Sequence, residues 1–214
     1  MRFLNAIIGH KRAGNLFGVN LEIKKGEWVF LDGESGSGKT TILESMFGLL
    51  KPLSGSFIDD RGRDLYRLSA SHLRAYRRTC GMIFQDHKLM PMKTVSENIG
   101  YALQICGYTH GSIVARTREL LTQVNMLAKA DVYVDQLSGG EAQRVAIARA
   151  LIHEPHVIFA DEPTASLDKR NTKIVLDLLQ KINKNGTTIV FATHDHELYT
   201  FVPEARVVDV EQWK

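Results

Sequence analysis

The sequence is poor in cysteine and proline and has no long apolar run. Its 214 residues contain five prolines and two cysteines, Cys80 and Cys106. Two isolated cysteines exclude a disulfide framework or a cysteine-rich metal site, so both are expected to be small core side chains. No apolar run approaches the roughly 20 residues that a membrane-spanning helix requires, and residues 1–5 do not begin a secretory signal. We therefore expect the chain to stay in the cytoplasm.

The chain also has little excess charge of either sign. Lysine and arginine outnumber aspartate and glutamate by 27 to 24, which leaves a formal net charge of +3. This excess is too small to favour nucleic acid as a partner. One short stretch is rich in arginine and is interpreted as a solvated helix face, with contact to anionic lipid headgroups or to a membrane partner as the alternative. It contains Arg67, Arg74, Arg77 and Arg78.

Apolar periodicity predicts a single α/β domain. The length suits one domain with a sizeable core, and no internal repeat or flexible linker divides it. Alternating strands and helices predict a parallel sheet with crossover helices, and the middle third of the chain reads as a helical insert. Strands are expected at residues 19–23 and 28–31, joined by a tight turn at residues 24–26, and at 81–84, 157–160 and 187–192. Helices are expected at residues 41–50, 95–105, 112–124 and 171–184, and after residue 140.

A glycine-rich loop stands between a predicted strand and a predicted helix. Residues 33–40 match the pattern G-x-x-x-x-G-K-[ST] in the context that this pattern requires. The glycines let successive N–H groups point at phosphate oxygens, Lys39 adds a charge toward the terminal phosphates, and Thr40 offers its hydroxyl to Mg²⁺. The residues expected to bind ATP are Gly33, Glu34, Ser35, Gly36, Ser37, Gly38, Lys39, Thr40 and Thr41. The loop alone does not choose among kinases, GTPases and motor ATPases.

Two carboxylates and a histidine follow apolar strands. Asp161 and Glu162 come directly after residues 157–160, and His194 follows the strand predicted at 187–192. The carboxyl ends of parallel strands line the ligand crevice of such a sheet, so these side chains are expected beside the nucleotide. Asp161 suits Mg²⁺ coordination, Glu162 can polarise the attacking water or accept its proton, and His194 can sense or stabilise the γ-phosphate. The sequence therefore predicts hydrolysis as well as binding.

A second helix start has the features of an anion site. Leu137 is followed by Ser138, Gly139, Gly140 and Glu141, and then by a predicted helix. The serine hydroxyl and the glycine amides form a helix N-terminus that can bind phosphate. Because the chain has one phosphate loop, this surface is expected to close on the nucleotide of a second copy. Such mutual closure predicts a twofold homodimer.

The order of these motifs resembles the ABC-type ATPases over nearly the whole chain. The resemblance implies a RecA-like P-loop NTPase core at about residues 1–85 and 156–214, with an antiparallel β subdomain and an inserted α-helical subdomain at about residues 86–155. It also implies that Gln85 takes part in Mg²⁺ binding and catalysis, that Asp168 belongs to the nucleotide site, and that ATP with Mg²⁺ holds two copies together. The motifs that carry it are the phosphate loop, Gln85, the segment LSGGE, the pair Asp161-Glu162, residues 166–168 and His194.

One segment is similar to the cell-division branch of this family. Residues 81–91 and 93–98 resemble the stretch around the same glutamine in that branch. The similarity implies an integral membrane partner, regulation of cell-wall hydrolases, and a peripheral position on the cytoplasmic face of the plasma membrane at the division site. Residues 89–92, Leu-Met-Pro-Met, are either an apolar groove for the partner or a locally buried loop. Subunits of lipoprotein-release or macrolide-export transporters are the alternative.

Two positions depart from the family pattern. Members usually place an aromatic side chain before the phosphate loop to stack on adenine, but no tyrosine or tryptophan stands there. His10 is expected to stack instead, whereas Phe17 is expected to pack in the core. Residues 164–168 read Thr-Ala-Ser-Leu-Asp instead of the frequent Thr-Gly-Asn-Leu-Asp. Two rival functions stay open: a soluble ABC ATPase acting on DNA or ribosomes, which the single motif set disfavours, and a scaffold with negligible turnover, which Glu162 and His194 disfavour.

Overall fold

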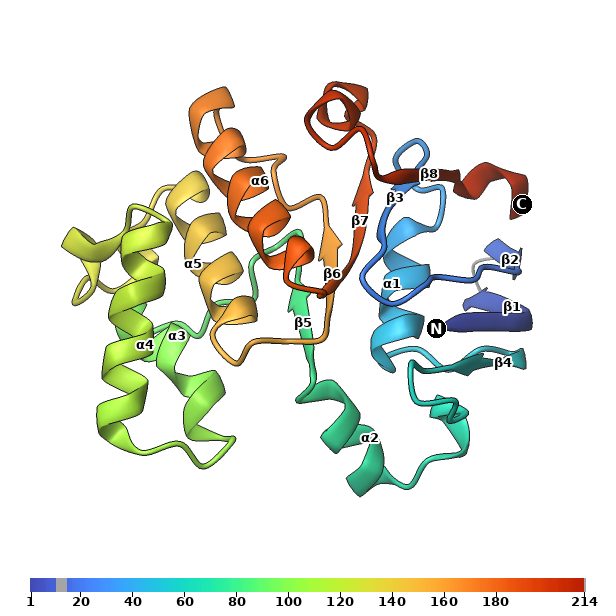
Figure 1. Cartoon of the computed structure of the whole chain (residues 1–214), viewed down its shortest axis with the longest axis horizontal. Helices are drawn as coiled ribbons and strands as arrows, with labels where there is room; N and C mark the ends of the chain where they lie inside the picture. The colour runs from blue at the N-terminus through green and yellow to red at the C-terminus, as the bar shows by residue number, and fades with distance from the viewer. Residues whose placement is uncertain (11–14, 214) are drawn as a thin grey trace.

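A five-stranded parallel sheet lies at the centre of the protein. The computed structural model describes residues 1–10 and 15–213, without the side chains of His10 and Asn15. The strands follow the order β5-β6-β7-β3-β8, and Figure 1 shows helices covering the sheet. The inner strands are short apolar runs buried on both faces, which is the pattern of a covered parallel sheet. The strands are Trp28–Asp32 (β3), Cys80–Ile83 (β5), Val157–Asp161 (β6), Thr188–Thr193 (β7) and Arg206–Asp209 (β8).

A three-stranded antiparallel sheet lies beside the parallel one (Figure 1). Its strands are Arg2–His10 (β1), Asn15–Val19 (β2) and Ser54–Ile58 (β4), in the order β2-β1-β4. The turn predicted at residues 24–26 is present, because the N–H of Glu27 donates to the carbonyl of Lys24 at 3.2 Å. The strand predicted at residues 19–23 is wrong, since β2 ends at Val19, and β2 and β3 belong to different sheets. The N–H of Gly26 donates to Thr188 Oγ1 at 2.9 Å, which directs the chain to β7. Residues 28–31 are fully buried, and such a strand suits the centre of a sheet better than an exposed hairpin.

Five of the six α-helices of the described residues begin at a side chain that caps them. The helices are Lys39–Phe47 (α1), Ala70–Arg77 (α2), Val95–Gln104 (α3), His110–Gln123 (α4), Gly139–Leu151 (α5) and Lys169–Lys184 (α6). Of these, α1 begins at a glycine without such a cap. Thr94 and Glu97 form a capping box at α3, and Asp168 caps α6. The helices predicted from apolar spacing are confirmed, with ends shifted by a few residues. Short 3-10 helices cover Leu65–Arg67, Leu127–Lys129, Val134–Gln136, His196–Phe201 and Val210–Trp213.

The arginine-rich stretch forms α2 and the turn before it. Arg74 and Arg78 are exposed, as expected of a solvated face. Arg77 is different, because its guanidinium donates to the carbonyl groups of Phe47 and Gly48 at the end of α1. A cation at a helix C-terminus satisfies carbonyls that lack partners within the helix. One arginine of this stretch therefore ties α2 to the helix that follows the phosphate loop.

The parallel sheet separates two apolar cores. Along β3, Trp28 and Phe30 belong to the core that includes α3 to α6, whereas Val29 and Leu31 belong to the core that includes α1 and the antiparallel sheet. The helices of the middle third thus share their packing with the sheet. This arrangement agrees with the expected core, antiparallel β subdomain and helical insertion, while the boundaries near residues 86 and 155 stay a prediction. Within residues 1–10 and 15–213, no helix is both long enough and apolar enough to span a membrane.

Candidate active site

The loop between β3 and α1 leaves the start of the helix open. Gly38 is the N-cap residue of α1 with a φ of 102°, and no side chain bonds to the amides of the first turn. A Cβ on Gly38 would lie 2.5 Å from the ring of Phe17, and one on Gly33 would lie 2.6 Å from Ser37 Oγ. Glycine is therefore required at both positions. The first-turn N–H groups of α1 stay available for an anion such as phosphate.

Lys39 lies across this loop with its side chain buried. Its Nζ donates to the carbonyl oxygens of Gly33 at 2.5 Å and Glu34 at 3.0 Å. The same Nζ lies 3.7 Å from Glu162 Oε1. Only 6% of the lysine is exposed, so the charge is held at a fixed place beside the open helix start. A phosphate group bound there would give Lys39 a charge-assisted partner.

Asp161 and Thr40 form an oxygen-rich corner next to Lys39. Thr40 Oγ1 donates to Asp161 Oδ2 at 2.7 Å, and Asp161 Oδ1 is buried without a partner. Burial raises the pKa of Asp161, although the bond from Thr40 opposes this rise. Hard oxygen donors around an unpartnered carboxylate oxygen fit Mg²⁺. Among the described residues, no cluster of three or more His, Cys, Asp or Glu could hold a metal ion, so phosphate oxygens would have to complete the coordination.

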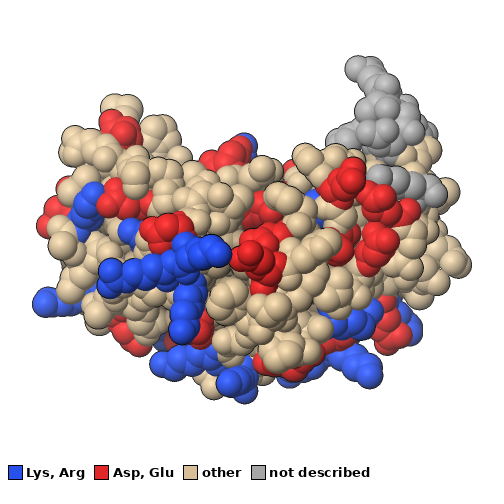
Figure 2. All heavy atoms as spheres, turned by 90° about the horizontal axis from the view of Figure 1, so that it is seen from above, with Lys and Arg blue, Asp and Glu red and all other residues tan. Residues whose placement is uncertain are grey.

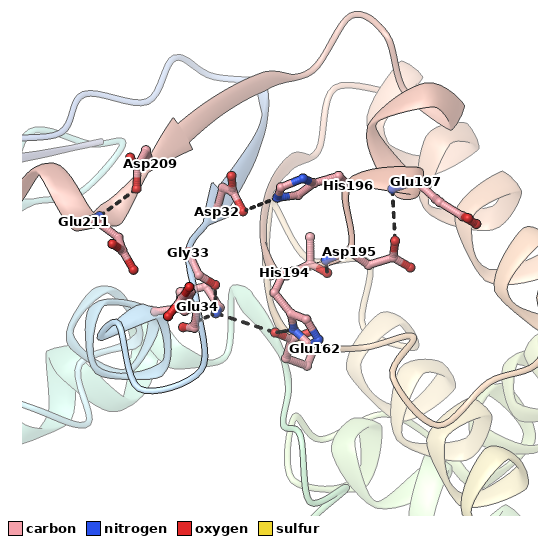
Figure 3. Close-up of polar contacts among 12 residues, drawn as sticks. Asp32, Gly33, Glu34, Glu162, His194, Asp195, His196, Glu197, Asp209 and Glu211 are labelled. Atoms are coloured by element: carbon pink, nitrogen blue, oxygen red, sulfur yellow. Dashed lines mark hydrogen bonds and ion pairs between the residues drawn. The ribbon is translucent and has the colours of Figure 1, made fainter.

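Glu162 and His194 meet at the end of two neighbouring strands (Figure 3). The imidazole Nδ1 of His194 donates to Glu162 Oε1 at 2.7 Å. Glu162 adopts a φ of 45°, an uncommon conformation for a residue other than glycine, and its N–H donates to the carbonyl of Ala192 at 3.0 Å. The glutamate side chain is 11% exposed and the histidine 62%. The carboxylate is thus fixed by Lys39 and His194 together.

These groups line one cleft of about 320 Å³. The structure brings together predicted residues from the phosphate loop, the acidic pair, the glutamine and the histidine, although their roles stay predictions. Phe17 and Ala165 line the same cleft without having been predicted to do so. The buried Phe17 packs as expected and also contacts Gly38. The side chain of His10 lies outside the described residues. The predicted residues in the cleft are Ser35, Gly36, Ser37, Gly38, Lys39, Thr40, Thr41, Gln85, Asp161, Glu162 and His194.

The second predicted anion site lies elsewhere, at the start of α5. Ser138 Oγ accepts from the N–H of Glu141 at 3.4 Å, and the N–H of Ser138 donates to Glu141 Oε2 at 3.0 Å. Lys129 pairs with Glu141 and, with the bond from Ser138, lowers the pKa of this carboxyl. A Cβ on Gly140 would lie 3.0 Å from the carbonyl of Ser166, and Asp168 caps α6 by accepting from the N–H of Asn171 at 2.8 Å. None of these lines the cleft described above.

Figure 2 shows acidic side chains on the face that carries the carboxyl ends of the strands, with lysine and arginine side chains beside them. The exposed ones near these strand ends are Glu34, Asp195, Glu197, Asp209 and Glu211. Exposed carboxylates near the strand ends disfavour an anion at those positions. An anionic ligand must therefore depend on the local positive groups of the loop, Lys39 and the helix start.

Comparison with known sequences identifies similar proteins. Residues 16–165 match the model of the ABC transporter family. The cell division ATP-binding protein FtsE of Streptococcus pneumoniae serotype 2 (strain D39) is 39% identical over 92% of this chain and 84% of its own length. FtsE of Mycobacterium tuberculosis is 41% identical over 90% of this chain and 83% of its own length. The methionine import ATP-binding protein MetN of Caulobacter vibrioides is 44% identical over 86% of this chain, but over only 55% of its own length.

Solved structures of ATP-binding cassettes share the fold. A dimeric structure of MJ0796, in a post-hydrolysis state bound to ADP and Pi, superposes with a TM-score of 0.87 at 33% identity and covers 98% of this chain and 94% of that one. The cbiO1 subunit of the cbiONQ transporter complex from Clostridium perfringens gives a TM-score of 0.80 at 28% identity, with 98% and 85% covered. Sequence and structure therefore agree on one family.

Proposed function

Because this chain belongs to the ABC transporter family and is an ATPase, we propose that it is the ATP-hydrolysing subunit of an FtsE-type membrane complex. The contact of Glu162 with both Lys39 and His194 carries the catalytic part of the proposal. The subfamily part rests on the FtsE relatives, which are 39–41% identical over about 90% of this chain, and on the resemblance of residues 81–91 and 93–98 to the cell-division branch. Cell division is therefore the proposed process, with import as an alternative.

The side chains of the cleft suit hydrolysis of the terminal phosphate. The open start of α1 and Lys39 hold the β- and γ-phosphates, and Glu162 polarises the attacking water or accepts its proton. His194, through Nδ1, fixes the glutamate and presents the rest of its ring toward the γ-phosphate. Thr40, Asp161 and Gln85 would hold Mg²⁺, which neutralises charge on the phosphates.

We extend the proposal to an ATP-dependent homodimer. Ser138 is exposed and Gly139 has open space around it, yet neither lines the cleft of its own chain. A second copy could place these groups over the nucleotide, and the twofold relation would form two equal sites. The dimeric MJ0796 structure with ADP and Pi supports this arrangement. Loss of the γ-phosphate on hydrolysis would then weaken the contact between copies.

The proposed partner is an FtsX-like integral membrane protein that anchors this subunit at the cytoplasmic face of the plasma membrane at the division site. ATP turnover would be coupled through it to the regulation of cell-wall hydrolases. Residues 89–92 combine features of a partner surface and of a buried loop. Met92 is 84% exposed, whereas the backbone N–H and C=O of Met90 both bond to the side-chain amide of the buried Asn98. Only the exposed end of this segment is free for a partner. Lipoprotein release, macrolide export and methionine import are the alternatives.

Depletion of this protein in its own cells tests the assignment. If the protein is a division subunit, depleted cells should form filaments or chains, and expression of the Glu162→Gln variant should not restore normal division. The same cultures would be scored for growth without methionine, for lipoprotein release and for macrolide resistance. Normal division with a defect in one of these transport processes would replace the cell-division proposal with that alternative. Coexpression with an FtsX-like protein should raise the ATPase rate, and an unrelated permease serves as the control.

A further inference from the structure

The segment that follows β7 carries a second histidine with a carboxylate partner. We call residues 193–197 the switch segment. His194 contacts Glu162, and two residues later His196 Nε2 donates to Asp32 Oδ1 at 3.3 Å. Figure 3 shows both contacts, one to the residue after β6 and one to the last residue of β3. The switch segment is therefore attached to two different strand ends.

Asp32 lies directly before the phosphate loop. The parallel pairing of β3 with β7 places Asp32 opposite Thr193. The next residue, Gly33, provides the carbonyl that accepts from Lys39 Nζ. The contact between His196 and Asp32 thus links the switch segment to the base of the loop that orients Lys39.

The ring of His196 has a defined place although it is largely exposed. It stacks on the ring of Tyr199 with centroids 5.4 Å apart and an interplanar angle of 26°. Tyr199 packs on Phe30 with centroids 4.8 Å apart, and Phe30 lies two residues before Asp32 on the same strand. The switch segment also bonds within itself, because the N–H of Asp195 donates to Thr193 Oγ1 at 3.0 Å.

We propose that His196 is a positioning residue, whose contact with Asp32 fixes the switch segment relative to the phosphate loop. It does not line the cleft with Lys39, so it acts through His194 and Glu162. Small displacements of catalytic groups cost much in rate, whereas a contact between exposed side chains adds little to global stability. The effect should therefore appear in turnover. This inference rests on the proposed hydrolytic role of Glu162 and His194.

Steady-state ATPase assays and ATP titrations on the full chain test the proposal. His196→Ala should lower kcat about five- to tenfold with KM for ATP changed less than about twofold, because the phosphate-binding loop is intact. His196→Gln should keep most of the rate, because its amide can donate to Asp32. Asp32→Ala combined with His196→Ala should be no slower than the slower single variant, since both remove one contact. His110→Ala, an exposed histidine at the start of α4, is the control.

Several results would overturn the role of His196. They are a wild-type kcat for His196→Ala, a larger change in KM than in kcat, a Gln variant as slow as the Ala variant, and rate losses that multiply in the double variant. Thermal unfolding of each variant separates a folding defect from a positioning defect, and the comparison of His196→Ala with His196→Gln carries the test if Asp32→Ala unfolds. Full hydrolysis by Glu162→Gln in the same assay would instead overturn the proposed catalytic site.

Discussion

The starts of α1 and α5 are both helix N-termini with glycines, but they differ in what already occupies their N–H groups. Gly38 provides no cap at α1, so the first-turn amides lack a side-chain partner. Ser138 and Glu141 form a capping box at α5, which occupies one amide of its first turn. Lys39 and the acidic pair surround the first site, whereas Lys129 near the second is paired with Glu141.

This difference predicts that the start of α1 can bind a phosphate group by itself, whereas the start of α5 adds contacts to a nucleotide that another copy already holds. The α1 site combines open amides, a buried cation and two carboxylates, Asp161 and Glu162, in one chain. The α5 site offers an exposed hydroxyl and glycines. Among the described contacts of Glu141, the cation is Lys129, which is paired with this glutamate. The first is expected to bind ATP by itself, and the second only when another copy presents the nucleotide.

Glu162→Gln is expected to give the largest change in ATPase rate. It should separate the hydrolysis step from ATP binding at the α1 site. The rate should fall by about 10² to 10⁴-fold, the usual contribution of a positioned acid or base, while ATP still binds. Size-exclusion chromatography should then show a dimer with MgATP. Glu154→Gln is a matched control, because Glu154 also has a positive φ but pairs with Arg116. A monomer at saturating MgATP would contradict the composite site.

Gly38→Ala should strongly weaken ATP binding at the α1 site. The new methyl group would overlap the ring of Phe17, and the residue would be held at a φ of 102°. Titration calorimetry should show an affinity loss of about 100-fold or more, equivalent to roughly 3 kcal/mol. Gly36→Ala keeps a positive φ but meets no neighbour within 4 Å, so a smaller loss is expected. Equal losses in both variants would show that Phe17 does not matter.

Gly139→Asp tests the α5 site without disturbing the isolated chain. A Cβ at Gly139 meets nothing within 4 Å, and an acidic residue in the first turn of a helix is favourable. We expect ATP affinity of the monomer to stay within about twofold, while repulsion of the partner's phosphates lowers kcat by about tenfold or more. Gly111→Asp, in the first turn of α4, has the same open surroundings. Equal activity of the two variants would contradict the homodimer.

The smallest expected effect is the change in stability, and in its pH dependence, that Asp161→Asn causes in the nucleotide-free chain; loss of the proposed Mg²⁺ ligand would be a separate and larger effect on activity. Burial raises the pKa of Asp161, so the folded chain holds this proton more tightly than the unfolded chain. Stability is therefore favoured below the unfolded pKa and is lost as pH rises through the folded pKa. Without nucleotide, the asparagine variant should be more stable at pH 7 by on the order of 1 kcal/mol. In urea unfolding, the difference should shrink toward about pH 4, and the exposed Asp60→Asn variant should show neither effect.

Local patterns in the sequence were sufficient for the phosphate loop and for most helices. Lys39 bonds to the carbonyls of Gly33 and Glu34 within the loop, and the caps of α3 and α5 are bonds across three residues. The strand predicted at residues 19–23 failed, and the sheet that β3 joins could not be predicted, because strand pairing is decided by distant partners. Trp28 pairs with Ile189 and Val29 with Arg206, and no local pattern identifies such partners.

The sequence by itself determined that this chain has an ATPase loop, an acidic pair after an apolar strand and a second glycine-rich helix start. Only the tertiary structure decided which of these features share a cleft, that Phe17 contacts Gly38, and that His196 contacts Asp32. The physical reason is the separation along the chain of the residues that interact. Helix caps and glycine turns depend on residues a few positions apart, whereas a cleft is formed where strand ends far apart in the chain meet at one edge of the sheet.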